Sequence, residues 1–111
     1  MKWFSAGKIN PEAKITKVKA GSKNICLVYN DDKYYALASR CPHAGADLSG
    51  GWCKEGKLVC PVHRFTYDLQ TGRGGEGQFD FVPTYPVKIK NGEVFVGVSS
   101  FWERLKAIFK S

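Results

Sequence analysis

The 111-residue sequence predicts a single all-β domain, an antiparallel β-sandwich or barrel. Two observations carry this prediction: many short β-rich segments are separated by turn residues, and the clearest two flank Asn91-Gly92. An Asn-Gly pair readily adopts the positive φ angles that a tight hairpin turn requires. The composition, 43% hydrophobic and 14% aromatic, is sufficient for a core, so disorder is not expected.

The segment 14–20 alternates polar and apolar residues, which is typical of a half-exposed edge strand. Its lysines would discourage pairing with another chain. Turns are expected at Gly21-Ser22, at residues 30–32 and at Gly50-Gly51, and Pro83 and Pro86 bracket a rigid extended piece. The expected strands span residues 3–6, 14–20, 25–29, 33–39, 57–60, 65–69, 84–90 and 93–98.

The last residues change to a helical period, which predicts a short C-terminal helix over about 100–110. The apolar face of this helix would contain Phe101, Trp102, Leu105, Ile108 and Phe109. Two interpretations stay open: a helix packed on its own β core, or an interfacial helix with a basic polar face on a membrane surface.

The net charge of +7 is unevenly distributed. Residues 39–85 contain five basic and five acidic side chains, whereas residues 1–24 contain six Lys and one Glu. The lysines are scattered along strand-like sequence rather than interleaved with aromatic residues, which argues against nucleic-acid binding. The excess charge indicates either a solvated basic face or a surface that attracts an acidic docking partner.

The sequence favours a cytoplasmic protein. Residues 1–11 contain no continuous apolar run of the kind found in a signal peptide, and no 18-residue apolar stretch suggests a membrane span. In such a setting, clustered Cys and His residues indicate a metal site more often than a disulfide framework.

The two histidines of the chain lie in two short elements, Cys41-Pro42-His43 and Cys60-Pro61-Val62-His63, separated by sixteen residues. Each element offers one thiolate and one imidazole, and a proline follows each cysteine. Such a set suits an iron–sulfur site, but Cys2His2 also suits tetrahedral zinc. A rival ligand set would use Cys53 with Cys60.

The pattern C-x-H-x16-C-x-x-H resembles the ligand signature of Rieske [2Fe–2S] proteins, in which two Cys hold one iron and two His hold the other. The flanking sequences 44–46 and 65–72 are similar to the same family, and the likeness is strongest from residue 36 to 72. The resemblance implies one [2Fe–2S] cluster per chain. It further implies a cluster-binding subdomain at about 39–85 and a basal β domain at 1–38 and 86–99.

The resemblance also implies a division of roles among the ligands. Cys41 and Cys60 would bind the inner iron, while His43 and His63 would bind the outer iron near the surface, from which the electron leaves. Groups around such ligands tune the metal. The surrounding residues implied by the resemblance are Pro42, Gly45, Pro61, Phe65, Tyr67 and Pro83.

The residues around the motif predict a low reduction potential within the family range of about −150 to +300 mV. High-potential family members join their ligand loops by a disulfide, but Ala46 and Val62 stand at those positions here. Phe65 replaces the serine whose hydroxyl those members also use, whereas Tyr67 is kept and would donate to a cluster sulfur. One bridge and one hydrogen bond fewer indicate the ferredoxin end of the range.

The family implies a Rieske ferredoxin, a one-electron carrier between a flavoprotein reductase and a terminal oxygenase or reductase. The chain is not expected to catalyse a reaction alone, because an oxygenase iron would need two further His and a carboxylate. The alternatives are a small Rieske-like subunit of an assimilatory nitrite reductase and a structural zinc module. Cys26 is expected to be a buried apolar residue and Cys53 a surface or semi-buried free thiol rather than a ligand.

Overall fold

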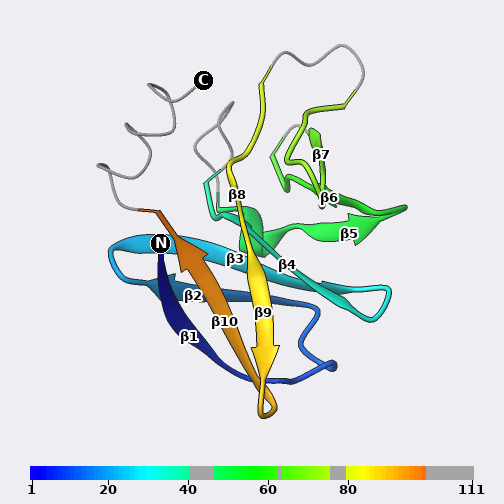
Figure 1. Ribbon diagram of the computed structural model, residues 1–111. Helices are drawn as coiled ribbons and strands as arrows, with labels where there is room; N and C mark the ends of the chain where they lie inside the picture. The colour runs from blue at the N-terminus through cyan, green and yellow to red at the C-terminus, as the bar shows by residue number, and fades with distance from the viewer. Residues whose placement is uncertain (41–46, 63, 76–79, 100–111) are drawn as a thin grey trace.

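The computed structural model describes residues 1–40, 47–62, 64–75 and 80–99, and its strands form three antiparallel sheets (Figure 1). The all-β prediction is confirmed. The first sheet has the order β1 (Lys2–Lys8), β10 (Glu93–Val98), β9 (Val87–Lys90); the second has β2 (Ile15–Ala20), β3 (Lys23–Asn30), β4 (Lys33–Ala38), β8 (Thr84–Tyr85); the third has β5 (Trp52–Lys54), β6 (Lys57–Val59), β7 (Thr66–Asp68).

Strand β3 forms the centre of the molecule because it is buried on both faces. Ile25 and Leu27 join one apolar core with Val94 of the first sheet. The alternate residues Cys26 and Val28 join a second core that contains residues of the third sheet. This double burial explains why the segment is continuously apolar, since a strand with one solvated face would alternate.

The predicted edge strand and hairpins are present. Strand β2 lies at the edge of the second sheet. Asp31 and Asp32, with φ of 51° and 62°, turn the chain from β3 into β4. Asn91 and Gly92, with φ of 52° and 75°, turn it from β9 into β10, as the Asn-Gly signal predicts.

The predicted strand 84–90 is wrong as one unit, because Pro86 divides it between two sheets. Tyr85 of β8 pairs with Ala36 in the second sheet, while Val87 of β9 pairs with Val96 in the first. Proline has no N–H to continue a ladder. The first predicted strand, by contrast, is longer than expected and continues to Lys8 through a bulge at Gly7 (φ 101°).

The region after the first ligand element also differs from expectation. The predicted Gly50-Gly51 turn is part of a 3₁₀ helix, η1 (Leu48–Gly50), followed by Gly51 and the unpredicted strand β5. A two-residue turn at Glu55 and Gly56, both at positive φ, joins β5 to β6. Glutamate is an unusual residue at positive φ, so the sequence does not signal this hairpin.

Figure 1 shows β5, β6 and β7 together at one end of the molecule, beyond the two larger sheets. The subdomain boundaries at about 39 and 85 stay a prediction. The expected helix at 100–110 lies outside the described residues. Among the described residues, no helix has the length and hydropathy needed to cross a membrane.

Candidate metal centre

The first two predicted ligands belong to the segment 41–46, and the residues on either side of this segment are paired with each other. Arg40 and Asp47 form an antiparallel bridge, and the Leu48 N–H donates to the Ser39 carbonyl at 2.7 Å. The segment 41–46 therefore leaves and rejoins the fold at neighbouring points. The predicted ligands Cys41 and His43, with Pro42 and Gly45, lie outside the described residues, as does His63.

Gly51 brings the end of the first ligand segment against the strand that leads to the second. A Cβ atom on Gly51 would lie 1.9 Å from the Val59 carbonyl oxygen, so no side chain fits there. Trp52 then pairs with Val59, the residue before Cys60. The two ligand-bearing segments thus meet through a backbone contact that requires glycine.

Pro61 lies beside the same helix η1. A Cβ atom on Gly50 would be 3.9 Å from Pro61 Cγ, an ordinary contact distance. Pro61 itself is exposed, and the neighbouring Val62 is 41% exposed. Pro61 of the second ligand element therefore packs against η1, whereas the next side chain, Val62, faces solvent.

Cys60 is fully buried where β6 ends. Its backbone N–H donates to the Phe65 carbonyl at 2.7 Å, which closes the loop of residues 61–64. Arg64 within this loop has a φ of 55°. The Cys60 side chain is therefore attached to a hydrogen-bonded backbone and is buried in the second core, which also contains Leu58 and Tyr67.

The donor set fits an iron–sulfur cluster as far as it is described. A buried thiol on a fixed backbone suits a thiolate ligand, and the ligand segments on either side converge. The described residues contain no group of three or more Cys, His, Asp or Glu side chains that could hold a metal ion. Only Cys60 of the four predicted ligands lies within these residues, so the ligand set stays a prediction.

Tyr67 is fully buried, and its hydroxyl donates to Asp80 Oδ2 at 3.0 Å. Sequence reasoning assigned Asp80 no role at the site and missed this contact. Thirteen residues separate the two side chains, and a loop pairing that includes the Gly74 N–H and the Asp80 carbonyl brings them together. The hydroxyl has a single proton, so this bond competes with the expected donation from Tyr67 to a cluster sulfur, which stays a prediction.

Pro83 connects the loop after β7 to the central sheet. Its carbonyl accepts the Ala38 N–H at 2.9 Å, two residues before Arg40. The preceding Val82 donates its N–H to the Gly72 carbonyl at 2.8 Å, and a Cβ on Gly72 would lie 1.9 Å from the Val82 carbonyl oxygen. A second glycine contact therefore fixes this side of the candidate centre.

The two remaining cysteines have the environments expected from the sequence. Cys26 is fully buried in the second core, and Cys53 is half-buried on β5; both are free thiols. Burial, followed by the nearby Cys53 and Asp47, raises the pKa of Cys26 to about 12. Burial also raises the pKa of Cys53. Both are neutral thiols near pH 7, and the rival Cys53–Cys60 ligand set gains no support.

Asp47 fixes the start of η1 next to the first ligand segment. Its Oδ1 accepts the Ser49 N–H at 3.0 Å and the Ser49 hydroxyl at 2.7 Å, and its Oδ2 accepts Lys17 Nζ at 2.8 Å. The bond from Lys17, then those from Ser49, lower the pKa of Asp47 to about 2. Asp47 is thus an N-cap that also connects η1 to β2.

Comparison with known proteins agrees with this geometry. The model of the Rieske [2Fe-2S] domain matches residues 2–86. The ferredoxin component of the naphthalene 1,2-dioxygenase/salicylate 5-hydroxylase systems of Ralstonia sp. is 31% identical over 97 residues, which cover 85% of this chain and 93% of that protein.

Two solved structures have the same fold. One, a complex of reduced oxygenase and oxidized ferredoxin in carbazole 1,9a-dioxygenase, contains a chain with a TM-score of 0.76 and 25% identity; the match covers 86% of this chain and 92% of that one. The other is a putative NADH-dependent nitrite reductase small subunit from Mycobacterium tuberculosis, with a TM-score of 0.78 and 21% identity over 89% and 96% of the two chains.

The matched region covers well over half of the sequence, and it includes both predicted ligand elements and the sheets that position them. The family match implies a [2Fe–2S] cluster as the cofactor. This chain belongs to the Rieske [2Fe–2S] family.

Proposed function

We propose that this protein is a one-electron carrier of the ferredoxin type, with one [2Fe–2S] cluster held by Cys41, His43, Cys60 and His63. The observation that carries this proposal is the match to a dioxygenase ferredoxin component over 93% of that protein's length. The sequence supports it, because both histidines belong to the motif and none is left for a separate catalytic iron.

The chain's own residues would position the cluster rather than transform a substrate. The bound cluster supplies reversible one-electron chemistry. Cys60 is fixed by its N–H bond to Phe65, and the 41–46 segment is anchored by Arg40 and Asp47. A fixed Cys60 backbone, and anchored residues on both sides of segment 41–46, favour electron transfer, because little of this surrounding structure has to rearrange when the charge changes.

The partners we propose are a flavoprotein reductase as donor and a terminal oxygenase as acceptor, all in the cytoplasm. A ferredoxin of the same fold forms a complex with the oxygenase of carbazole 1,9a-dioxygenase, which supports the acceptor half of this assignment. Anaerobic electron transfer from the reduced protein to such an oxygenase in its oxidised form, followed by stopped-flow absorbance, tests it. The carrier role would be refuted if the reduced cluster passed no electrons to any oxygenase of this class.

We further propose that the midpoint potential lies at the low end of the family range. The chain lacks the cysteine pair and the serine of the high-potential members, and the Tyr67 hydroxyl donates to Asp80. Redox titration followed by electron paramagnetic resonance (EPR) measures this potential. A midpoint above roughly +100 mV would contradict the proposal.

A second candidate is the small subunit of a nitrite reductase, favoured by the TM-score of 0.78 to such a chain. At 21% identity this likeness supports the fold alone, and the ferredoxin relative is 31% identical. Copurification with a large sirohaem protein would favour the second candidate. A colourless protein that contains zinc would instead support a structural zinc module.

A further inference from the structure

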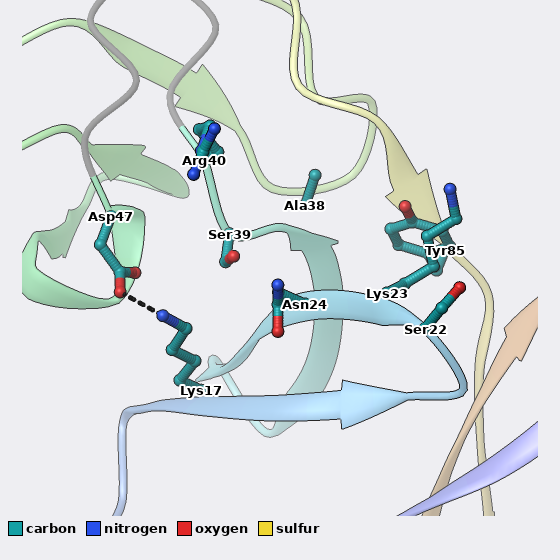
Figure 2. Close-up of a pocket in the computed structure, with 9 residues that line it drawn as sticks. All are labelled: Lys17, Ser22, Lys23, Asn24, Ala38, Ser39, Arg40, Asp47 and Tyr85. Carbon is teal, nitrogen blue, oxygen red and sulfur yellow. Dashed lines mark hydrogen bonds and ion pairs between the residues drawn. The ribbon is translucent and has the colours of Figure 1, made fainter.

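A surface pocket of about 350 Å³ lies beside the anchored ends of the first ligand segment. Strand β2, the start of β3, the end of β4 and the start of η1 all contribute to it. Figure 2 shows Lys17 reaching from β2 to Asp47, with Ser39 and Asn24 between this ion pair and Lys23. We call it the Lys23–Arg40 pocket, and its charged lining residues are Lys17, Lys23, Arg40 and Asp47.

The pocket has uncompensated positive charge. Three cations and one carboxylate line the pocket, and that carboxylate is already used, because Oδ2 of Asp47 accepts from Lys17 and Oδ1 from Ser49. Neither Lys23 nor Arg40 forms an ion pair with a carboxylate of the described residues. Both side chains belong to exposed residues, so an incoming anion can reach them.

The pocket is also close in sequence and space to the first ligand segment. Arg40 directly precedes Cys41, and its bridge to Asp47 joins the two ends of residues 41–46. A partner bound at this pocket would therefore lie next to the loop that carries two predicted cluster ligands. Electron transfer needs such closeness, but only briefly, so a charge-guided contact is suited to it.

We propose that the Lys23–Arg40 pocket binds Asp or Glu side chains of the redox partner and so guides it to the first ligand loop. This inference rests on the proposed carrier function, and it names the chemistry of the partner surface. The carboxylates would bind Lys23 and Arg40, with polar groups such as the Asn24 amide beside them. Lys17 and Asp47 would stay paired with each other and would not bind the partner's carboxylates.

A protein carboxylate suits the pocket better than a nucleic-acid backbone. The lining has a net charge of only +2, which suits a few carboxylates better than the long series of phosphates of a nucleic-acid backbone. The volume admits a few side-chain groups rather than a duplex. Lys23 and Arg40, with the Asp47 carboxylate nearby, favour a partner surface whose charges are opposite to theirs.

The test uses the cluster-loaded protein and an acidic flavoprotein donor, flavodoxin reduced by light, in stopped-flow absorbance. The variant is Lys23→Glu with Arg40→Glu. Its matched control is Lys54→Glu with Lys57→Glu, which makes the same charge change on the cross-strand pair of the β5–β6 hairpin. At low ionic strength, the pocket variant should lower the second-order rate constant at least about tenfold, and the control less than about threefold.

Two controls test whether the rate loss is an electrostatic effect on docking: high salt and a small donor that is not a protein. Near 0.5 M NaCl, the pocket variant and the wild type should differ by less than about twofold, because salt screens exposed charges. Free reduced flavin should reduce both proteins at the same rate. The proposal is overturned if the two variants lose equal rate, or if a 12-base-pair DNA binds the wild type more tightly than hexaglutamate does.

The same samples separate this inference from the proposed function. Iron content and the EPR signal should be unchanged in the pocket variant, because neither side chain is a predicted ligand and Arg40 anchors residues 41–46 through its backbone bridge to Asp47. If the cluster is present and the pocket variant reacts with flavodoxin like the wild type, only the docking inference fails. If the wild type contains no iron, the proposed function itself fails.

Discussion

The two faces of the central sheet are packed in different ways. On one face, Ile25 and Leu27 meet Val94 and Val96 of a sheet whose strands have four to seven residues. On the other, the core extends to a sheet in which every strand has three residues. We call residues 47–62, 64–75 and 80–83 the cluster half, and the remaining described residues, 1–40 and 84–99, the basal half.

The cluster half depends on close backbone contacts rather than on long ladders. Gly51 against Val59 and Gly72 against Val82 each leave no space for a side chain. Isolated sheets of such short strands have little stability of their own. Long ladders and an apolar core therefore stabilise the basal half, whereas the cluster half combines its core with short ladders and these close backbone contacts, and we expect the bound cluster to stabilise it further.

The largest expected effect comes from replacing Cys60, the one predicted ligand among the described residues. Cys60→Ala should abolish the EPR signal of the reduced protein and increase hydrogen exchange across β5, β6 and β7, because the cluster no longer joins the two ligand segments. Exchange in β1, β9 and β10 should stay close to that of the wild type. Cys53→Ala, the control, should keep the cluster, and equal exchange gains in both halves would refute the comparison.

The next effect tests the glycine contact between the ligand segments. In Gly51→Ala, the added Cβ meets the Val59 carbonyl, so the free energy of unfolding should fall by roughly 3 kcal/mol and cluster occupancy should fall with it. Gly56→Ala is the control, because no atom lies within 4 Å of its added Cβ and only its positive φ costs about 1 kcal/mol. Urea unfolding and iron content measure both. Similar losses in the two variants would argue against the contact.

A smaller effect is expected from the basal core. Val94→Ala should lower the free energy of unfolding by about 2 kcal/mol, since a fully buried side chain leaves a cavity. The EPR signal and the midpoint potential should not change, because Val94 belongs to the core on the far face of β3. A shifted midpoint in this variant would show that the two halves are coupled more tightly than the packing indicates.

The smallest effect concerns the ion pair that joins the halves. The pKa of Asp47 is lowered from 3.8 to about 2, so its stabilising contribution is complete above pH 3.8 and is lost as the pH falls toward 2. Both side chains are about half exposed, so the contribution should be below about 1 kcal/mol. Lys17→Met in the cluster-free Cys60→Ala background should remove it, measured as urea midpoints between pH 7 and pH 3. A stability difference that grows below pH 3.8 would contradict the assignment.

The basal half could be predicted largely from sequence, because its signals are local. Asn91-Gly92 predicts a hairpin, and the apolar run at residues 25–29 predicts a buried strand. The cluster half was predicted through its motif instead. Its strand β5 and the Tyr67–Asp80 bond were missed, since a turn with Glu55 at positive φ and a contact between distant residues have no local signal.

We propose that two thiolates and two imidazoles of this chain hold a pair of irons. Iron and acid-labile sulfide analysis of anaerobically purified protein, with low-temperature EPR after dithionite reduction, decides whether they do. We expect about two irons and two sulfides per chain and a reduced-state signal that Cys60→Ala abolishes. Protein that contains zinc, or neither iron nor sulfide, would contradict it.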